Sequence, residues 1–256
     1  MVPDPAGQVP FFIVAHAGLI ELPDEVGALG RRVSQAWIVV PAFNEAARIG
    51  ATLQGLCAYA SDVVVVDDGS TDGTGDVAAG YPVTILRHPI NCGQGTALRT
   101  GIAFALERGA DVIVTFDADG QHDPTEIAAL VAPVLRGEVD VVIGSRFLGR
   151  SVGMPRARRA MLKAARVFTR ASSGLRVTDP HSGLRAFSQA AARRISFLHD
   201  GMAHASELIE QIAVHRLRCC EVPVTVHYTP ATLAKGQSNW SALSIIGHLL
   251  AGRVIK

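Results

Sequence analysis

Short apolar runs alternate with longer amphipathic stretches from residue 36 to residue 144. The runs are rich in Val and Ile and are bounded by Gly, Pro, Asp or Asn, as buried strands are. They occupy residues 36–41, 62–67, 82–87, 111–116 and 139–144. The stretches between them repeat apolar residues at helical spacing over 49–60, 98–106 and 127–135. This alternation predicts an α/β fold in which helices cover both faces of a parallel sheet.

The alternation ends after Gly144. Beyond it we expect a strand at 182–187, a helix at 203–217 and a last strand at 221–227. The segment 150–176 contains eight Lys and Arg residues and no acid. It is interpreted either as a solvated helix face or as a surface that attracts an anionic partner.

The two ends of the chain differ from this pattern. Residues 1–35 have three prolines in the first ten positions and no sustained period, so we interpret them as an N-terminal extension. Residues 242–255 carry an apolar helical stripe beside Arg253 and Lys256. That stripe would either dock on the protein or lie in a membrane interface.

Composition restricts the class of protein. Hydrophobic residues make up 48% and charged residues 18% of the 256 positions, which excludes a disordered chain. The formal net charge of +1 argues against a general nucleic-acid binder. No apolar run approaches the roughly 20 residues that span a bilayer. No basic residue precedes the apolar stretch at 9–20, so a signal peptide is not expected. We expect a cytoplasmic protein that is soluble or lies on a membrane surface.

Four cysteines occur, and none has a spacing typical of a zinc site. They are Cys57, Cys92, Cys219 and Cys220. We expect reduced thiols, as is usual in the cytosol.

Polar or glycine-rich segments follow each of the first five predicted strands. They are residues 41–45, 67–72, 91–95, 117–121 and 144–146. In an open parallel sheet, ligands bind beyond the carboxyl ends of the strands. Five such segments on one edge therefore predict a binding site there.

Asp117 and Asp119 are the clearest metal ligands in that site. In extended backbone, side chains two positions apart project to the same face, so both carboxylates and Gln121 converge. Two carboxylates without further acids suit Mg²⁺ or Mn²⁺ completed by water and substrate phosphates. The alternative is a solvated turn in which an aspartate caps the next helix.

Asp67 is the candidate for nucleotide recognition. Its carboxylate follows four valines and can accept an N–H group from uracil or guanine without choosing between them. Its alternative role is to cap the following helix, which is the role that we favour for Ser70 and Asp72.

Six motifs occur in order, and together they resemble family 2 glycosyltransferases. They are VVPAFNE at 39–45, VVDDGSTD at 65–72, NCGQG at 91–95, FDADGQ at 116–121, GSRF at 144–147 and DPHSGLR at 179–185. The resemblance is to the branch of dolichol-phosphate mannosyltransferases and polyprenyl-phosphate glycosyltransferases. It implies a GT-A fold, a Rossmann-like, mostly parallel sheet within a single catalytic domain at 36–228. Residues 229–256 would then form an acceptor-side loop and an amphipathic C-terminal helix.

The resemblance also implies roles for individual residues. The nucleotide would be held by Pro41, Phe43, Glu45, Asp67 and Gly95. The divalent ion and the diphosphate would be held by Asp117, Asp119 and Gln121. Phosphate of the donor or of the acceptor would meet Arg146 and Arg185. Many relatives have Lys where Gln94 stands, so a charged contact is not expected at that position.

The implied reaction transfers a sugar, with inversion, from a GDP-mannose or UDP-glucose type of donor to a polyprenyl phosphate. A lipid phosphate is already anionic and requires cations to place it, whereas a hydroxyl acceptor requires a general base. Glu207 is the available base, unless it is an exposed helical acid. The expected partners are the nucleotide sugar, the lipid phosphate and the inner face of the membrane, to which the enzyme would bind peripherally. Two alternatives of another class are a haloacid-dehalogenase-type phosphatase with Asp117 as nucleophile and an inactive sugar-nucleotide-binding subunit.

Overall fold

The computed structural model describes residues 36–60, 62–197 and 204–229. The predicted N-terminal extension and the C-terminal stripe lie outside these residues. In the described part, seven strands form one sheet in the order β3-β2-β1-β4-β6-β5-β7. The strands are β1 (Ala36–Ala42), β2 (Asp62–Asp67), β3 (Thr84–Arg87), β4 (Val112–Thr115), β5 (Val141–Val152), β6 (Arg185–Ser188) and β7 (Cys219–His227).

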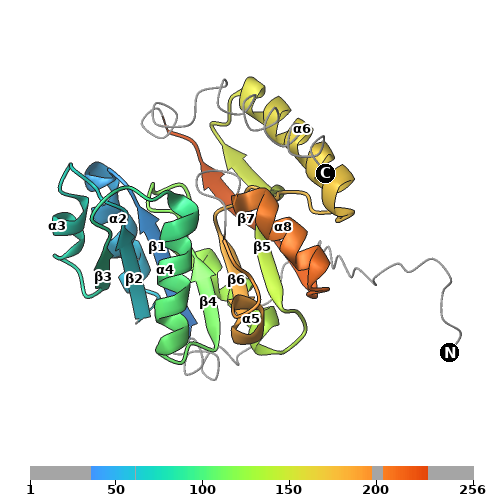
Figure 1. Cartoon of the computed structure of the whole chain (residues 1–256). Coiled ribbons are helices and arrows are strands. Elements are labelled where there is room, and N and C mark those ends of the chain that lie inside the picture. Colours follow the sequence, from blue (N-terminus) through green and yellow to red (C-terminus); the bar gives the residue numbers. More distant parts are fainter. Residues whose placement is uncertain (1–35, 61, 198–203, 230–256) are drawn as a thin grey trace, which may run out of the picture.

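Helices cover both faces of this sheet, as the alternation of strands and helices predicts (Figure 1). The helices are α2 (Ala46–Cys57), α3 (Thr74–Ala78), α4 (Gln94–Glu107), α5 (Ile127–Leu135), α6 (Arg156–Ser173), α7 (Gln189–Ala192) and α8 (His204–Val214). One hydrophobic cluster joins α2 and α5 to the sheet, and a second joins α4, α7 and α8 to the other face. Short α3 is the helix that the capping interpretation of Ser70 and Asp72 expected, although no apolar periodicity predicted it.

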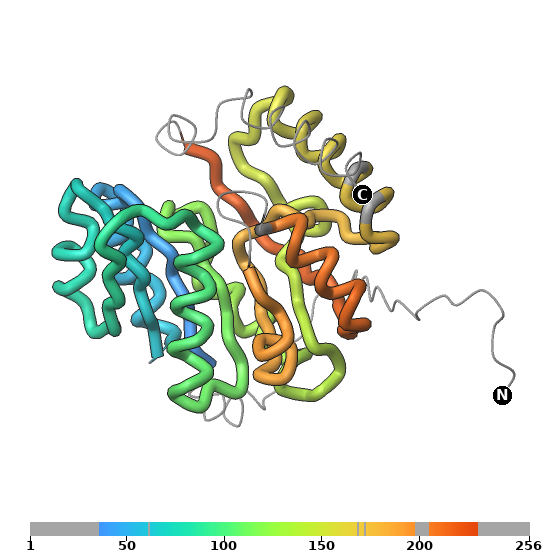
Figure 2. The backbone as a smooth tube through the Cα atoms, in the orientation of Figure 1, coloured from blue at the N-terminus to red at the C-terminus, as the bar shows by residue number. Residues whose placement is uncertain are grey.

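The direction of β6 makes the sheet mixed. β6 pairs antiparallel with both β4 and β5, while the other neighbouring strands pair in parallel. Figure 2 shows β6, in orange, between green β4 and yellow-green β5. Because β6 alone is reversed, β4 and β5 still run in the same direction. The carboxyl ends of β1, β2 and β4 therefore meet at one edge.

Two predicted strand boundaries differ from the structure by three residues or more. β5 does not end at Gly144 but continues to Val152, because its second half pairs with β7 after an irregularity between Ser145 and Arg150. β6 begins at Arg185 and not at residue 182. The preceding residues form a loop that packs against the end of β4, a contact that local periodicity does not encode.

The basic segment forms α6, which lies beyond the ends of β5 and β7 (Figure 1). Its buried face includes Leu162 and Thr169. No helix in the described ranges combines the length and the apolar character needed to cross a membrane.

Candidate active site

Asp117 and Asp119 lie in a turn at the carboxyl end of β4. The predicted extended geometry is wrong, because β4 ends at Thr115 and the chain turns at residues 118–119. The hydroxyl of Thr52 on α2 donates to the Ala118 carbonyl oxygen at 3.1 Å and fixes this turn. The Gln121 backbone N–H donates to Asp119 Oδ1 at 3.0 Å. The two carboxylates are nevertheless brought together by the turn.

The electrostatics of the turn show this proximity. Two causes together raise the pKa of Asp119 to about 6. The larger is burial of the carboxylate, and the second is the negative charge of Asp117. Asp119 is therefore a buried acid beside a second acid, and water screens the repulsion between their charged forms poorly. A divalent cation between them would relieve that repulsion. The donor set therefore fits the metal that the sequence predicts.

Asp117 has three further neighbours from distant parts of the chain. Gln94, at the start of α4, donates from Nε2 to Asp117 Oδ1 at 3.1 Å. His122 Nε2 lies 3.6 Å from Asp117 Oδ2. Gly183 packs so tightly on the carboxylate that an added Cβ would lie 1.9 Å from Oδ2. The neutral amide of Gln94 thus contacts Asp117.

The loop that carries Gly183 is anchored by buried charges. Arg146 on β5 donates from Nε to Asp179 Oδ2 at 2.6 Å and from Nη1 to the Tyr228 hydroxyl at 2.5 Å. Glu221 on β7 accepts from the Asp179 backbone N–H at 2.9 Å. Arg146 is therefore bonded within the protein and positions the loop. A contact between Arg146 and phosphate stays a prediction.

Arg185, on β6, differs from Arg146 in its bonding. It is 1% exposed, and its Nε and Nη2 atoms have no hydrogen-bond partner in the described structure. Burial lowers the pKa of Arg185 to about 10, although the negative charges of Asp117 and Asp179 oppose this shift. A buried guanidinium with unused donors is costly unless an anion accepts them. The structure thus brings Arg185 close to Asp117. Its contact with phosphate stays a prediction.

The predicted nucleotide residues lie at the ends of β1 and β2. Pro41 is buried in β1, whereas the Phe43 side chain is 39% exposed at the edge. Glu45 forms an ion pair with Arg48 at 2.6 Å. The Asp67 carboxylate is buried and accepts from the Ser70 backbone N–H at 3.0 Å. Gly95 is buried in the first turn of α4.

Two predicted caps have different partners. Asp72 accepts from the Thr74 backbone N–H at the start of α3 and from the Ala46 N–H at the start of α2, both at 3.0 Å. Ser70 instead accepts from the backbone N–H of Asn44. The capping prediction therefore holds for Asp72 and is wrong for Ser70.

Glu207 lies in the first turn of α8 and is 8% exposed, so the interpretation as an exposed helical acid is wrong. A role as a general base stays a prediction.

Sequence reasoning missed several residues of the site. They are His122, Asp179, Gly183 and Glu221. The motif at 179–185 contains two of them and gave a signal, but their contacts depend on strands that are distant in the sequence. Glu221 lies in an apolar strand, and a charged residue there is a weak signal for a buried bond.

Comparison with known proteins gives a consistent result. The sequence profile described as "Glycosyl transferase family 2" matches residues 37–196. A UDP-N-acetylglucosamine–dolichyl-phosphate N-acetylglucosaminyltransferase of Methanococcus voltae is 31% identical over 84% of this chain and 94% of its own length. An undecaprenyl-phosphate mannosyltransferase of Micrococcus luteus is 35% identical over 73% of this chain and 81% of its own length.

A solved structure has the same fold. Glucosyl-3-phosphoglycerate synthase of Mycobacterium tuberculosis, in complex with Mn²⁺ and UDP-glucose, superposes with a TM-score of 0.64 at 22% identity. The match covers 88% of this chain and 82% of the synthase. The likeness confirms the predicted GT-A fold.

Proposed function

Because the chain belongs to glycosyl transferase family 2 and is a glycosyltransferase, we propose that it transfers a hexosyl group from a nucleoside diphosphate sugar to a polyprenyl phosphate. The observation that carries this proposal is the juxtaposition of Asp117 with the buried, incompletely bonded Arg185. Asp117 can bind a cation, and Arg185 can bind an anion. The two residues therefore suit a reaction between two substrates that carry phosphate. The names of the two relatives above, each a transferase for a lipid phosphate, support the acceptor.

The donor would lie across the ends of β1 and β2. Asp67 offers a buried carboxylate for an N–H of the base, and the exposed ring of Phe43 offers a flat apolar surface. Pro41, Glu45 and Gly95 complete the nucleotide side. Uracil and guanine both present a suitable N–H, so GDP-mannose and UDP-linked hexoses are equivalent at Asp67.

Asp117, Asp119 and Gln121 would hold Mg²⁺ or Mn²⁺. When bound, such an ion neutralises the charge that develops on a leaving diphosphate. Burial and then the negative charge of Asp117 raise the pKa of Asp119, so its charged form is unfavourable without a counter-ion, and this supports a cation there.

Arg185 would orient the acceptor. A phosphate monoester is anionic at neutral pH, so its oxygen can attack the anomeric carbon without first losing a proton. The new carbon–oxygen bond forms as the bond to the diphosphate breaks, and the anomeric configuration inverts. Charge-assisted hydrogen bonds from a guanidinium are strong and directional, which suits the placing of a phosphate.

Helix α6 supports peripheral membrane binding. Five basic residues share one side of the helix at helical spacing: Arg156, Arg159, Lys163, Arg166 and Arg170. Beside them runs an exposed stripe of four alanines and Val167, whose side chain is 66% exposed. Cations next to exposed apolar side chains suit an anionic lipid surface. Arg158 faces the protein, because its guanidinium lies 5.6 Å from the Tyr228 ring centroid.

Incubation with radiolabelled nucleotide sugars tests the acceptor. The purified chain would receive polyprenyl phosphate, Mn²⁺ or Mg²⁺, and GDP-mannose, UDP-glucose or UDP-N-acetylglucosamine in turn. We expect label in the lipid phase with one donor, and no transfer by Asp119→Ala. Transfer to a soluble hydroxyl acceptor alone would overturn the lipid-phosphate proposal and make Glu207 the leading base. Binding of nucleotide with neither transfer nor donor hydrolysis would favour an inactive subunit.

Co-sedimentation with anionic vesicles tests the membrane surface. Replacing Arg156, Lys163 and Arg170 with Ser removes three exposed cations, each worth about 1 kcal/mol near anionic lipid. The matched control replaces Arg108, Arg193 and Arg194, which are also exposed but lie at the opposite edge of the sheet. We expect only the first variant to lose salt-sensitive binding. Equal loss in both variants would contradict a specific role for α6.

A further inference from the structure

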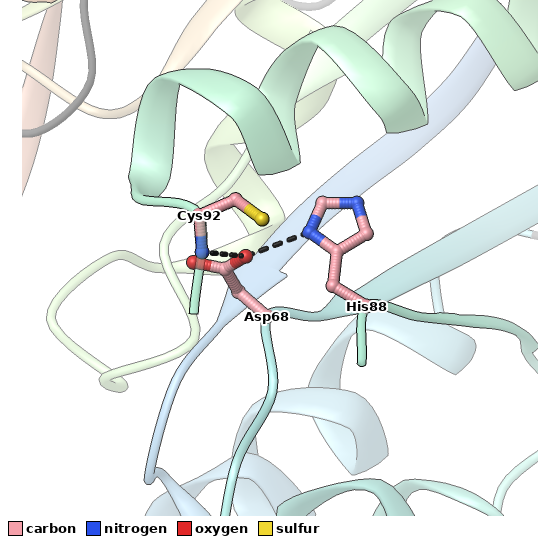
Figure 3. A group of neighbouring side chains, drawn as sticks. All are labelled: Asp68, His88 and Cys92. Atoms are coloured by element: carbon pink, nitrogen blue, oxygen red, sulfur yellow. Dashed lines mark hydrogen bonds and ion pairs between the residues drawn. The ribbon is translucent and has the colours of Figure 1, made fainter. Parts of the chain in front are cut away.

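Asp68, His88 and Cys92 form a cluster beside the candidate active site (Figure 3). Asp68 follows β2, His88 follows β3, and Cys92 precedes α4. One carboxylate oxygen, one ring nitrogen and the sulfur all lie within 4.8 Å of one another. The spacing of the cysteines did not predict a zinc site. The fold forms the cluster by bringing Asp68, which is 24 positions before Cys92, next to it.

We propose that this cluster binds one thiophilic divalent ion of the Zn²⁺ type, separate from the carboxylate pair at Asp117 and Asp119. Thiolate, imidazole and carboxylate are the three side-chain donors that Zn²⁺ uses in proteins. Three protein ligands leave a fourth position open for water, as in many zinc sites that are not purely structural. The thiolate distinguishes the site from one for Mg²⁺, which prefers oxygen ligands.

The hydrogen bonds of His88 resemble those that usually orient a metal-bound histidine. Nδ1 of His88 lies 2.7 Å from Asp68 Oδ1, and this short contact holds one proton. A metal ion would replace that proton. Nε2 lies 3.0 Å from the Thr100 hydroxyl, which can then accept the ring N–H. A metal-bound histidine usually donates its second ring N–H in this way.

The Asp68 carboxylate is oriented by the backbone of the neighbouring loop. Its Oδ1 accepts from the Cys92 N–H at 3.0 Å, and its Oδ2 accepts from the Gly93 N–H at 2.8 Å. The side chain is 3% exposed, so the carboxylate has little freedom to turn away. A ligand that is fixed before the metal arrives loses little conformational entropy on binding.

Solvent reaches the cluster along the loop between β3 and α4. Cys92 is half-buried, while Ile90 is 68% exposed and Asn91 is also exposed. Binding would release the thiol proton, and the His88 ring proton would move from Nδ1 to Nε2, where Thr100 can accept it. The ligand Cys92 lies two positions before Gln94, and Gln94 contacts Asp117. The ion would share no ligand with the carboxylate pair at Asp117 and Asp119.

Cobalt(II) titration of the full chain tests the proposal, because a thiolate bound to Co²⁺ gives a near-ultraviolet charge-transfer band. We expect the band with one equivalent of Co²⁺ and its displacement by Zn²⁺. Cys92→Ser should abolish it, since the backbone N–H remains but the sulfur is lost. Cys57→Ser is the matched control, because Cys57 is also a half-buried free thiol. Asp119→Asn should keep the band, which separates this site from the carboxylate pair.

A second variant tests the hydrogen bond between His88 and Thr100. Thr100→Val removes the acceptor for the ring N–H and should weaken Zn²⁺ binding about 10- to 100-fold in competition with a chelating indicator. Circular dichroism would confirm that each variant is folded. Absence of the band in the wild type, or its persistence in Cys92→Ser, would show that the cluster is a hydrogen-bonded structural contact only. The outcome does not depend on transferase activity.

Discussion

The edge formed by β1, β2 and β4 and the region between β5, β6 and β7 stabilise their charges differently. At the edge, Asp119 and Asp67 accept a backbone N–H two or three positions away, from Gln121 and Ser70, although Asp68 and Asp117 there also bond to residues more than 20 positions away. In the second region, Arg146 bonds to Asp179, which is 33 positions away. The first kind of bond forms with its own loop, whereas the second forms only when the sheet is assembled. Substitutions at the edge should therefore affect ligand binding, and those in the second region should affect stability.

The largest effect is expected for Arg146→Ala. The substitution leaves the Asp179 carboxylate buried without its cation, and breaking a buried pair in this way costs about 3–5 kcal/mol. Urea denaturation would measure the loss. The matched control is Arg218→Ala, which breaks an exposed pair with Asp140 and should cost less than about 1 kcal/mol. Equal costs for the two variants would contradict the difference between the regions.

Gly183→Ala should follow in size. The added Cβ would overlap Asp117 Oδ2, so the carboxylate or the loop must move. A displacement of about 1 Å at a reacting centre can cost about 100-fold in turnover. Steady-state kinetics would measure this loss, with circular dichroism to confirm folding. Gly80→Ala serves as the control, because its Cβ would meet only one atom, at 3.4 Å. Unchanged turnover in Gly183→Ala would remove Asp117 from the reacting centre.

Asp67→Asn should weaken donor binding. The substitution keeps the shape of the side chain but removes its charge, so a charged hydrogen bond worth about 1–3 kcal/mol is lost. Calorimetry with UDP and with GDP would measure the affinity and would also identify the base. If both affinities stay unchanged, Asp67 does not belong to the nucleotide site.

The smallest effect concerns Asp119→Asn and its dependence on pH. The pKa of Asp119 rises from an ordinary 3.8 to about 6 on folding, so the folded state binds more protons between these values. The free energy of unfolding therefore falls as pH rises from about 4 to 6. Above pH 6 the charged Asp119 lowers the stability by a constant amount. Without metal at pH 7, Asp119→Asn should therefore be more stable than the wild type.

Thermal unfolding in the presence of a chelator at pH 4 and pH 7 measures this difference. The stabilisation by Asp119→Asn should disappear at pH 4, where the native aspartate is protonated. Added Mn²⁺ should raise the melting temperature of the wild type but have little effect on the variant. A stabilisation that grows toward pH 4 would contradict the raised pKa.

The sequence predicted most of the sheet because its signals are local. Runs such as the four valines before Asp67 are buried on both faces, and burial of this kind shows in composition. The strand-end motifs likewise predicted that the carboxylates of Asp117 and Asp119 lie together, although the turn at Ala118 differs from the predicted extended geometry. The sequence did not predict the length of β5, because the alternating residues near Val152 become a strand only by pairing with β7.

The amino-acid sequence by itself determined which segments are strands and helices, and which strand ends carry carboxylates. Tertiary structure alone decided that β6 is reversed, that Gly183 closes on Asp117, and that Asp68 meets Cys92. The physical reason is the range of the forces involved. Apolar periodicity and the hydrogen bonds within helices and turns act over a few residues, so their pattern is visible along the chain. The partner of a buried charge or thiol is set by the order of strands in the sheet, which depends on the packing of the whole domain.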